Sequence, residues 1–250
     1  MSNISIKVIS GPTVSIEYAG LHLLTDPTFD PETTYDLGGG ASLRKTKGSP
    51  VEAQSLLPVD AVLLSHDHHP DNLDIAGREF LAEVPLTLTT QDGAARLDGE
   101  ARGLAPWETF EIQHVTVTAL PALHGPDGDD TEDIIGQVIG FLLAAEGEPT
   151  VYISGDNASL KVVEQIAERV PNIDTAIIFA GAARSPFFSG APLTLDGQGA
   201  VEAAKILKPA HVVIAHADSW EHFSDTMENA HQAFENAGMG DLLRPAGGVF

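Results

Sequence analysis

The part of this chain that most constrains its fold is an apolar segment that ends in a cluster of histidines and aspartates. Residues 59–64 (VDAVLL) have the composition of a buried strand, and residues 65–73 (SHDHHPDNL) follow directly. Imidazole and carboxylate groups are ligands that borderline metals such as zinc prefer. His66 and His68 lie two positions apart just after a rigid strand, so both rings can point at one ion. Because a solvated polar loop more often contains Ser, Gly, Asn or Lys, the pattern predicts a metal site.

The composition predicts a folded protein with a sizeable core. Of the 250 residues, 43% are hydrophobic and 20% charged, which suits a single domain over residues 1–250. No apolar run approaches the roughly 20 residues that span a bilayer. Residues 1–5 lack the features of a signal peptide, so we expect a cytoplasmic protein. The chain has no cysteine, so any metal must be held by His, Asp, Glu or Asn.

The charge of the chain bears on its partners. The formal net charge is −23, from 36 acidic and 13 basic residues. A field of this sign repels nucleic acid and anionic membrane surfaces. We therefore expect a small-molecule substrate, no nucleic acid polymer and no membrane partner. Strong acidity also occurs in chains from salty environments, and the sequence makes no prediction of the oligomeric state.

The order of the expected elements indicates α/β layers. Residues 26–50 are rich in Pro, Gly and Thr without a clear period and are expected to form a long functional loop. Strands followed by alternating strands and helices are typical of a layered α/β domain. Apolar runs and periodicity predict strands at residues 5–9, 13–18, 21–25, 59–64, 86–89, 110–120, 137–144, 150–154, 175–179 and 211–215, and helices at residues 73–83, 158–170, 199–207 and 224–237, with a helical turn at 93–97.

Three further residues follow expected strands in the same way. His124, Asp156 and His216 each stand where an apolar strand breaks into a loop that contains Gly, Pro or Asp. Ligands of α/β folds collect at loops beyond strand ends. Rigid strands that supply one ligand each suit a preorganised metal site. We therefore expect these three residues to converge with His66 and His68.

Taken in chain order, the five residues just named resemble the ligand set of the metallo-β-lactamase superfamily. Within it, the chain is similar to the branch that includes ascorbate-6-phosphate lactonases and related metal-dependent hydrolases. Residues 24–27 (LTDP) and 207–216 resemble the early Asp-Pro element and the last strand of that branch. The resemblance covers essentially the whole chain. It implies a four-layer αββα sandwich with the metals at one edge of its two sheets, and it places Asp26 where it can orient a ligand histidine.

The resemblance also implies a role for each matching residue. It assigns His66, His68 and His124 to a first metal site. It makes Asp156 the carboxylate that bridges two metals and His216 the last ligand of a second site. The implied cofactor is therefore a divalent metal, with one or two ions per chain.

The chain departs from the family pattern His-x-His-x-Asp-His in residues 66–72 (HDHHPDN), which contain one extra residue and an Asn where the last His is expected. If the loop absorbs the insertion, Asp71 keeps its second-site role and Asn72 replaces a ligand. If it does not, Asp71 falls in the His position and Pro70 in the Asp position. Either way the second site loses an imidazole, and His69 is a further candidate for a substitute ligand.

This departure predicts two sites of unequal affinity. We expect a firm first site and a weaker second site formed by Asp71, Asp156 and His216. Zinc suits the imidazole-rich site, and a harder metal such as manganese becomes plausible at the weaker one.

The expected activity is hydrolysis by a metal-activated water. A bound divalent metal acidifies water and makes hydroxide available near neutral pH. In this hypothesis Asp71 orients the hydroxide or accepts its proton, and His222 lines the pocket as a general acid or hydrogen-bond donor. The expected substrate is a small molecule: a lactone, an ester or a phosphorylated sugar derivative.

Basic residues give few clues to the substrate. Arg184 follows an expected strand, and Arg44, Lys45 and Lys47 lie in the long early loop. Such groups can hold a phosphate or carboxylate. For residues 44–47 a solvated surface loop is the favoured interpretation, whereas for Arg184 both interpretations stay open.

Two other functions are compatible with the sequence. One is a phosphodiesterase acting on a nucleotide or a phospholipid, although the net charge counts against polymeric nucleic acid. The other is a metal-binding protein with little catalysis, which the Asn at position 72 favours and the remaining ligand-like residues disfavour.

Overall fold

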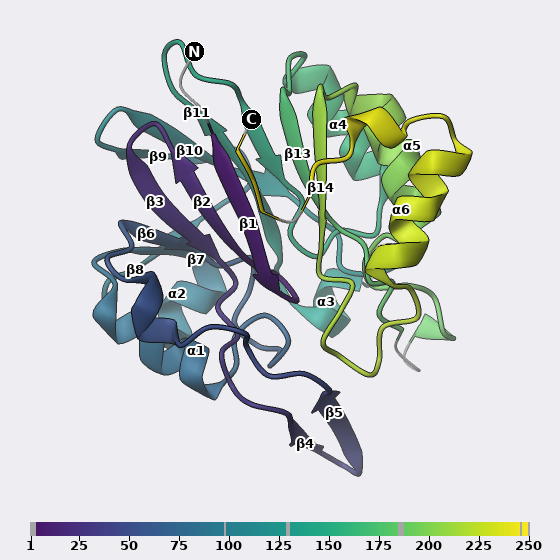
Figure 1. Cartoon of the computed structure of the whole chain (residues 1–250). Coiled ribbons are helices and arrows are strands. Elements are labelled where there is room, and N and C mark those ends of the chain that lie inside the picture. The colour runs from purple at the N-terminus through teal and green to yellow at the C-terminus, as the bar shows by residue number, and fades with distance from the viewer. Residues whose placement is uncertain (1–3, 98, 129–130, 185–187, 246, 250) are drawn as a thin grey trace.

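Two β-sheets face each other in this protein, and helices cover the outer face of each sheet (Figure 1). Buried apolar side chains fill the space between the sheets and the space between each sheet and its helices. This arrangement confirms the predicted four-layer αββα sandwich. No helix among the residues that the structure describes is long and apolar enough to cross a membrane. The computed structural model describes residues 4–97, 99–128, 131–184, 188–245 and 247–249.

The first sheet contains the strand that leads into the histidine-rich loop. In order across the sheet, its strands are β15 (Gly247–Val249), β1 (Ser5–Ser10), β2 (Thr13–Tyr18), β3 (Leu21–Thr25), β6 (Ala61–Leu63), β7 (Thr87–Thr90) and β8 (Ala101–Leu104). β3, β6, β7 and β8 run parallel to one another. All three residues of β6 are buried, because a parallel strand inside a layered fold is covered on both faces.

The second sheet contains the strands that precede His124, Asp156 and His216. In order, its strands are β14 (His211–Ala215), β13 (Thr175–Phe179), β12 (Val151–Ile153), β11 (Ile139–Ala144), β10 (Val115–Pro121) and β9 (Thr109–Ile112). β12, β13 and β14 are parallel, so their carboxyl ends meet at one edge of the sheet.

The helices begin where the sequence offers a capping side chain. Asp74, Ser159, Asp196 and Thr226 each accept a hydrogen bond from the backbone of the first helical turn that follows. The α-helices are α1 (Ile75–Phe80), α2 (Gln91–Leu97), α3 (Thr131–Ile135), α4 (Leu160–Arg169), α5 (Gly197–Leu207) and α6 (Met227–Asn236), and 3₁₀ turns cover Ala53–Leu56, Leu81–Glu83 and Gly240–Leu242.

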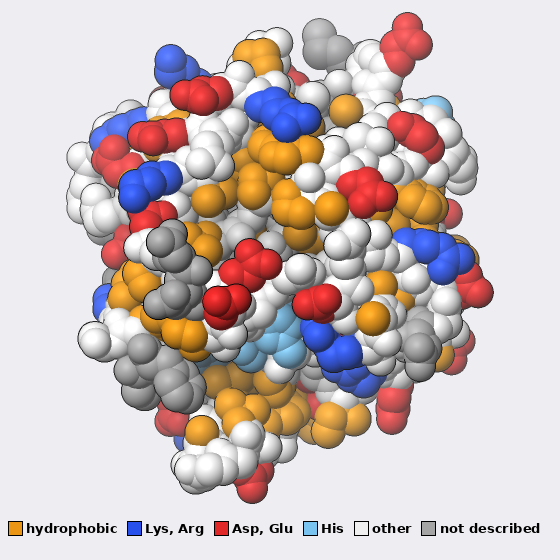
Figure 2. All heavy atoms as spheres, turned by 180° about the vertical axis from the view of Figure 1, so that it is seen from behind, with side chains coloured by type: hydrophobic (Ala, Val, Ile, Leu, Met, Phe, Trp, Pro, Cys, Tyr) orange, Lys and Arg blue, Asp and Glu red, His pale blue; other side chains and the backbone are white. Residues whose placement is uncertain are grey.

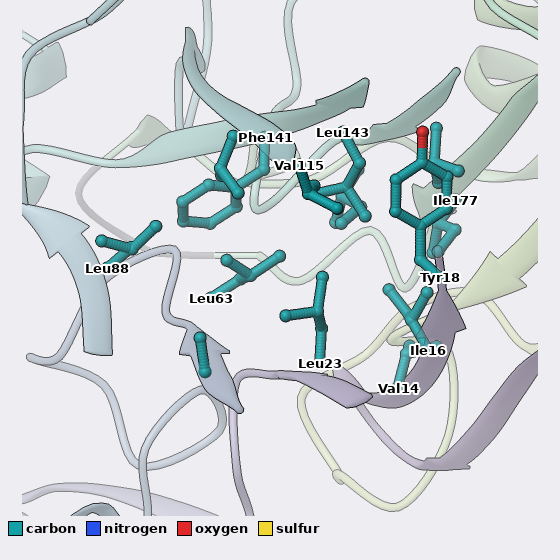
Figure 3. Packing of buried hydrophobic residues seen from close by; sticks show 14 of the residues in the cluster. Val14, Ile16, Tyr18, Leu23, Leu63, Leu88, Val115, Phe141, Leu143 and Ile177 are labelled. Carbon is teal, nitrogen blue, oxygen red and sulfur yellow. The ribbon is translucent and has the colours of Figure 1, made fainter. Parts of the chain in front are cut away.

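The core between the sheets follows from the alternation of side chains along strands. Every second residue of a strand points to the same face of its sheet. Figure 3 shows Ile16, Leu23 and Leu63 of the first sheet directed toward Phe141 and Leu143 of the second. Each of these side chains is almost fully buried, so both sheets are held rigidly behind the loops at their edge.

The structure corrects three expectations about local structure. Residues 26–50 are not a plain loop, because they contain the hairpin of β4 (Thr33–Gly38) and β5 (Ala41–Lys45), which projects from the body in Figure 1. Residues 110–120 form two strands instead of one, since Gln113 turns the chain at a φ of +54°. β8, β15 and α3 have no counterpart among the expected elements.

Candidate metal centre

The predicted ligands gather at one edge of the sandwich because each lies just beyond the end of a strand. β6 ends three residues before His66, β10 three before His124 and β12 three before Asp156, while β14 leads directly into His216. The exposed fraction of these four side chains is 5% or less. The structure thus brings together residues that are far apart in the chain, as the strand-end pattern predicts.

Histidines form the first group of this centre, the imidazole group. It consists of His66, His68, His69 and His124. Their ring centroids lie 4.7–5.3 Å apart in the contacting pairs, and His66 Nε2 is 3.0 Å from His69 Nδ1. Potential ligand atoms of His66, His68 and His69 all lie within 4.8 Å of one another, and so do those of His66, His124 and Asp156. His69 therefore belongs to the imidazole group.

Backbone carbonyls set the tautomers of two of these rings. His124 Nδ1 donates to the Leu193 carbonyl oxygen at 2.8 Å, and His68 Nε2 donates to the Ile135 carbonyl oxygen at 2.6 Å. Because a carbonyl only accepts, the opposite ring nitrogen keeps its lone pair. His68 Nδ1 is buried without a hydrogen-bond partner. In the neutral form of each ring, the opposite nitrogen, Nε2 of His124 and Nδ1 of His68, carries the lone pair that a metal ligand needs.

A serine links Asp26 to His66. Asp26 Oδ1 accepts from the Ser65 hydroxyl at 2.7 Å and from the Ser65 backbone at 2.8 Å. Since the hydroxyl has given its only hydrogen to Asp26, its oxygen accepts from His66 Nδ1 at 3.0 Å. This leaves the lone pair on His66 Nε2. Asp26 orients His66 through Ser65, and Ser65 is a residue that sequence reasoning missed.

Two carboxylates and two imidazoles form the second group, here called the carboxylate group. It consists of Asp71, Asp156, His216 and His222. Asp71 Oδ2 lies 3.0 Å from His222 Nε2 and 3.7 Å from His216 Nε2, and His216 Nε2 lies 3.5 Å from Asp156 Oδ1. The buried Asp71 sits beside His216, which is the arrangement expected if the loop absorbs the extra residue.

Asp156, a member of the carboxylate group, also faces the imidazole group. Its Oδ1 faces His216 at 3.5 Å, and its Oδ2 faces His124 Nε2 at 3.6 Å. Asn72, fully buried, donates from its amide nitrogen to Asp156 Oδ1 at 3.3 Å and to the Ser65 hydroxyl at 3.4 Å. One carboxylate therefore joins the imidazole group to the carboxylate group, and Asn72 braces it.

The protonation states suit cation binding. Burial and the neighbouring rings hold the pKa of His66 well below its usual range, and burial lowers the pKa of His69 to about 4. Burial also lowers the pKa of His124. Burial opposes ionisation of Asp71, yet the hydrogen bond from His222 and the nearby His216 lower the pKa of Asp71 overall. His66, His69 and His124 are therefore neutral at pH 7 and Asp71 is ionised.

Several buried polar atoms of the centre lack a hydrogen-bond partner among the described residues. They are His68 Nδ1, Asn72 Oδ1, Asp156 Oδ2, both ring nitrogens of His216 and His222 Nδ1. Leaving such atoms unsatisfied is costly. The separations of 3.5–3.7 Å among Asp71, Asp156, His124 and His216 are long for hydrogen bonds. Two atoms that bind one zinc ion at about 2.1 Å in a tetrahedral site lie about 3.4 Å apart, so the donor set fits a divalent metal.

The backbone is strained at two positions of the centre. Asp26 has a φ of +31° and His216 a φ of +53°, values that side chains other than glycine rarely adopt. Such strain persists where the surrounding structure holds it and is common at functional sites. Both residues come at the end of a strand, so the strain turns their side chains into the centre.

A cavity of about 250 Å³ opens beside both groups. Figure 2 shows histidine side chains in a recess of the surface, with hydrophobic side chains next to them. The polar part of the lining is His69, Asp71, His124, Arg184 and His222, with Ser42 from the hairpin. The rest of the lining is apolar and comprises Leu37, Ala41, Leu43, Pro70, Ile135, Ala183 and Leu193.

Of the basic residues singled out in the sequence, Lys45 is the one that lies differently from what was expected. Arg184 lines the cavity, and its guanidinium donates to the Ser224 hydroxyl and to the Gly190 carbonyl oxygen. Arg44 is exposed and pairs with Glu32 at 2.8 Å, as a surface loop would have it. The same interpretation is wrong for Lys45, which is fully buried because it neutralises Asp74.

Comparison with protein families gives one match that spans most of the chain. Residues 22–217 match the family described as the beta-lactamase superfamily domain. This range includes all predicted metal ligands and ends one residue after His216.

Several curated relatives are described as UPF0173 metal-dependent hydrolases. The UPF0173 metal-dependent hydrolase of Pelotomaculum thermopropionicum is 30% identical over 187 residues, which are 72% of this chain and 74% of the relative. That of Pyrococcus furiosus is 28% identical over 166 residues, 65% of this chain and 68% of the relative.

Solved structures show the same fold across the chain. An isothiocyanate hydrolase from Delia radicum gut bacteria superposes with a TM-score of 0.82 at 23% identity, covering 98% of each chain. A possible metal-dependent hydrolase from Veillonella parvula gives 0.83 at 18% identity, covering 100% of this chain and 99% of its own. CmlA, a diiron β-hydroxylase from Streptomyces venezuelae, gives 0.71 at 16% identity, covering 100% of this chain and 54% of its own.

Proposed function

This chain belongs to the β-lactamase superfamily, and from its site we infer that it is a metal-dependent hydrolase of a small molecule with an apolar body. The observation that carries this inference is the position of Asp156 between the imidazole group and the carboxylate group, with one oxygen facing each. A hydrolytic centre needs metal-binding side chains beside a space for the substrate, and the cavity provides that space.

In this proposal His66, His68 and His124 hold a first cation, with His69 beside them, and Asp71 and His216 contribute to a second position. Neutral imidazoles suit zinc at the first position, and the two carboxylates make manganese a candidate at the second. A divalent metal bound by these residues would supply hydroxide at neutral pH and polarise the substrate.

The remaining steps fall to the side chains of the protein. Asp71 is ionised at neutral pH, so it can hold a water molecule in place or accept its proton. Asp26 and Ser65 keep His66 in one tautomer throughout. The apolar wall formed by Leu37 and Leu43 covers the substrate and limits the access of bulk water.

The lining of the cavity favours a neutral substrate. Arg184 is the single cation among the described lining residues, and its guanidinium is engaged by Ser224 and Gly190. A phosphate group is usually bound by several charged or backbone donors. We therefore favour a lactone or an ester with an apolar substituent over a phosphorylated sugar derivative or a phosphodiester.

A substrate panel tests this function. The protein is loaded with zinc or manganese and assayed on aliphatic lactones, aryl esters, an aryl isothiocyanate and a phosphodiester. We expect hydrolysis of at least one neutral substrate, loss of more than about 100-fold of the rate in His66→Ala, and full activity in His114→Ala, because His114 is exposed on the turn between β9 and β10. Activity on the phosphodiester alone would favour the alternative function, and no activity with any metal would favour a metal-binding role.

A further inference from the structure

We propose that His222 is a metal ligand and completes the second cation position together with Asp71, Asp156 and His216. The proposal rests on the proposed function only in requiring a divalent metal. It revises the role expected from the sequence, in which His222 acts as a general acid and Asn72 or His69 completes the second position.

The placement of His222 is the first argument. Its Nε2 lies 3.0 Å from Asp71 Oδ2, and the same oxygen lies 3.7 Å from His216 Nε2. His216 Nε2 lies in turn 3.5 Å from Asp156 Oδ1. Asp71 Oδ2 thus lies between His222 Nε2 and His216 Nε2, and His216 Nε2 also faces Asp156. Neither ring nitrogen of His216 has a hydrogen-bond partner there.

The two alternatives to His222 make other contacts at the centre. The atom of Asn72 that faces Asp156 is the amide nitrogen, at 3.3 Å, and an amide nitrogen is a donor that does not bind cations. The Nδ1 of His69 lies 3.0 Å from His66 Nε2, in the imidazole group. Among the three candidates, His222 is the one whose nitrogen lies against Asp71.

The segment that carries His222 is held in place by the β4–β5 hairpin. The Thr46 backbone donates to the Ser219 carbonyl oxygen at 2.7 Å, and the Glu221 backbone donates to the Arg44 carbonyl oxygen at 3.0 Å. Trp220, between them, stacks on Tyr35 with ring centroids 5.8 Å apart. These contacts fix the loop one residue before His222, and such rigid support is what a metal ligand requires.

The exposure of His222 distinguishes it from an ordinary buried histidine. Its side chain is 21% exposed and lines the cavity, while Asp71 beside it is 7% exposed. A ligand placed here closes the second position on the cavity side. The cation at that position would then border the substrate space directly.

Metal binding by the full-length protein tests the proposal without recourse to activity. Metal-free protein is titrated with Co²⁺, Zn²⁺ and Mn²⁺ by calorimetry, and bound metal is counted by elemental analysis after gel filtration. For the wild type we expect two equivalents of different affinity. For His222→Ala and His222→Gln we expect the first equivalent to be unchanged and the second to be lost or weakened at least about 100-fold, more than removal of an outer hydrogen-bond partner causes.

Two further variants sharpen the comparison. His114→Ala, which changes an exposed histidine, is expected to bind both equivalents like the wild type. Asn72→Ala removes a brace of Asp156 and is expected to weaken the second equivalent by only about tenfold. Circular dichroism spectra and melting temperatures confirm that each variant is folded before its metal is counted.

The outcomes separate this proposal from the proposed function. If the wild type binds two equivalents and His222→Gln binds both with unchanged affinity, His222 is not a ligand, while the metal-dependent function stands. If the wild type binds a single equivalent, the second position does not exist; this proposal and the second position of the proposed function then fail, while hydrolysis with one metal stands. A wild type that binds no divalent metal overturns both.

Discussion

Lys45 Nζ lies 2.9 Å from Asp74 Oδ2, and neither side chain is exposed to solvent. Asp74 also accepts hydrogen bonds from the backbone of Phe29, Asp30 and Gly77, and it caps α1 directly after the histidine-rich loop. The ion pair therefore joins the base of the β4–β5 hairpin to the loop that carries the predicted metal ligands.

Replacement of this lysine is expected to destabilise the protein. Lys45→Met leaves the buried charge of Asp74 without its partner, which costs about 3 kcal/mol. Urea unfolding of the metal-free variant measures the loss. Lys47→Met is the matched control, because Lys47 is exposed two residues away. Equal midpoints for the two variants would contradict a structural role of the buried pair.

The link from Asp26 through Ser65 to His66 leads to a prediction about metal affinity. Ser65→Ala removes the acceptor that holds the proton on His66 Nδ1. We expect the first metal equivalent to bind about 10- to 100-fold more weakly, as for other partners that orient ligand histidines. Competition with a chromophoric chelator measures the change. Ser55→Ala, at an exposed position, should have no effect, and an unchanged affinity in Ser65→Ala would refute the link.

The layered core was predictable because it depends on local patterns. Ile16 and Leu23 lie in apolar runs or alternations whose period of two is visible in the sequence. The β4–β5 hairpin was not predictable in this way, since most of its residues are partly or fully exposed and show no apolar alternation. The base of the hairpin is instead held by contacts with Trp220, which lies far away in the chain.

The candidate site was predictable to the extent that its residues follow strands. His124, Asp156 and His216 meet because their strands end at one edge. The carbonyl oxygens of Ile135 and Leu193, which set two tautomers, carry no side-chain signature. A sequence can therefore indicate which residues converge, whereas the groups that orient them depend on tertiary structure.

The buried imidazoles predict how stability depends on pH in the metal-free protein. Burial lowers the pKa of His66, His69 and His124, that of His69 from 6.5 to about 4. Between these values the unfolded chain binds more protons than the folded chain. The stability that these three histidines contribute should therefore be fully present above pH 6.5 and be lost as the pH drops toward 4. His216, whose pKa rises because Asp156 outweighs burial, contributes with the opposite sign as the pH rises above 6.5.

Chemical unfolding at a series of pH values in the presence of a chelator measures this slope. His69→Leu removes one of the three titrating groups and should make the decline between pH 6.5 and 4 shallower. His114→Leu changes an exposed histidine and should keep the slope of the wild type. If His69→Leu has the slope of the wild type, His69 does not contribute to the pH dependence.

Leu37 of the β4–β5 hairpin is expected to contribute to substrate specificity. Leu37 is 50% exposed and lines the cavity beside the metal centre. Leu37→Ala should raise KM for a lactone or ester with an apolar substituent roughly fivefold, because about 1 kcal/mol of apolar contact is lost. The effect on kcat should be small, since Leu37 is not among the candidate metal ligands or the polar residues of the lining. Ile75→Ala is the matched control, because Ile75 is 64% exposed but does not line the cavity. An equal KM change in both variants would mean that the hairpin does not contact the substrate.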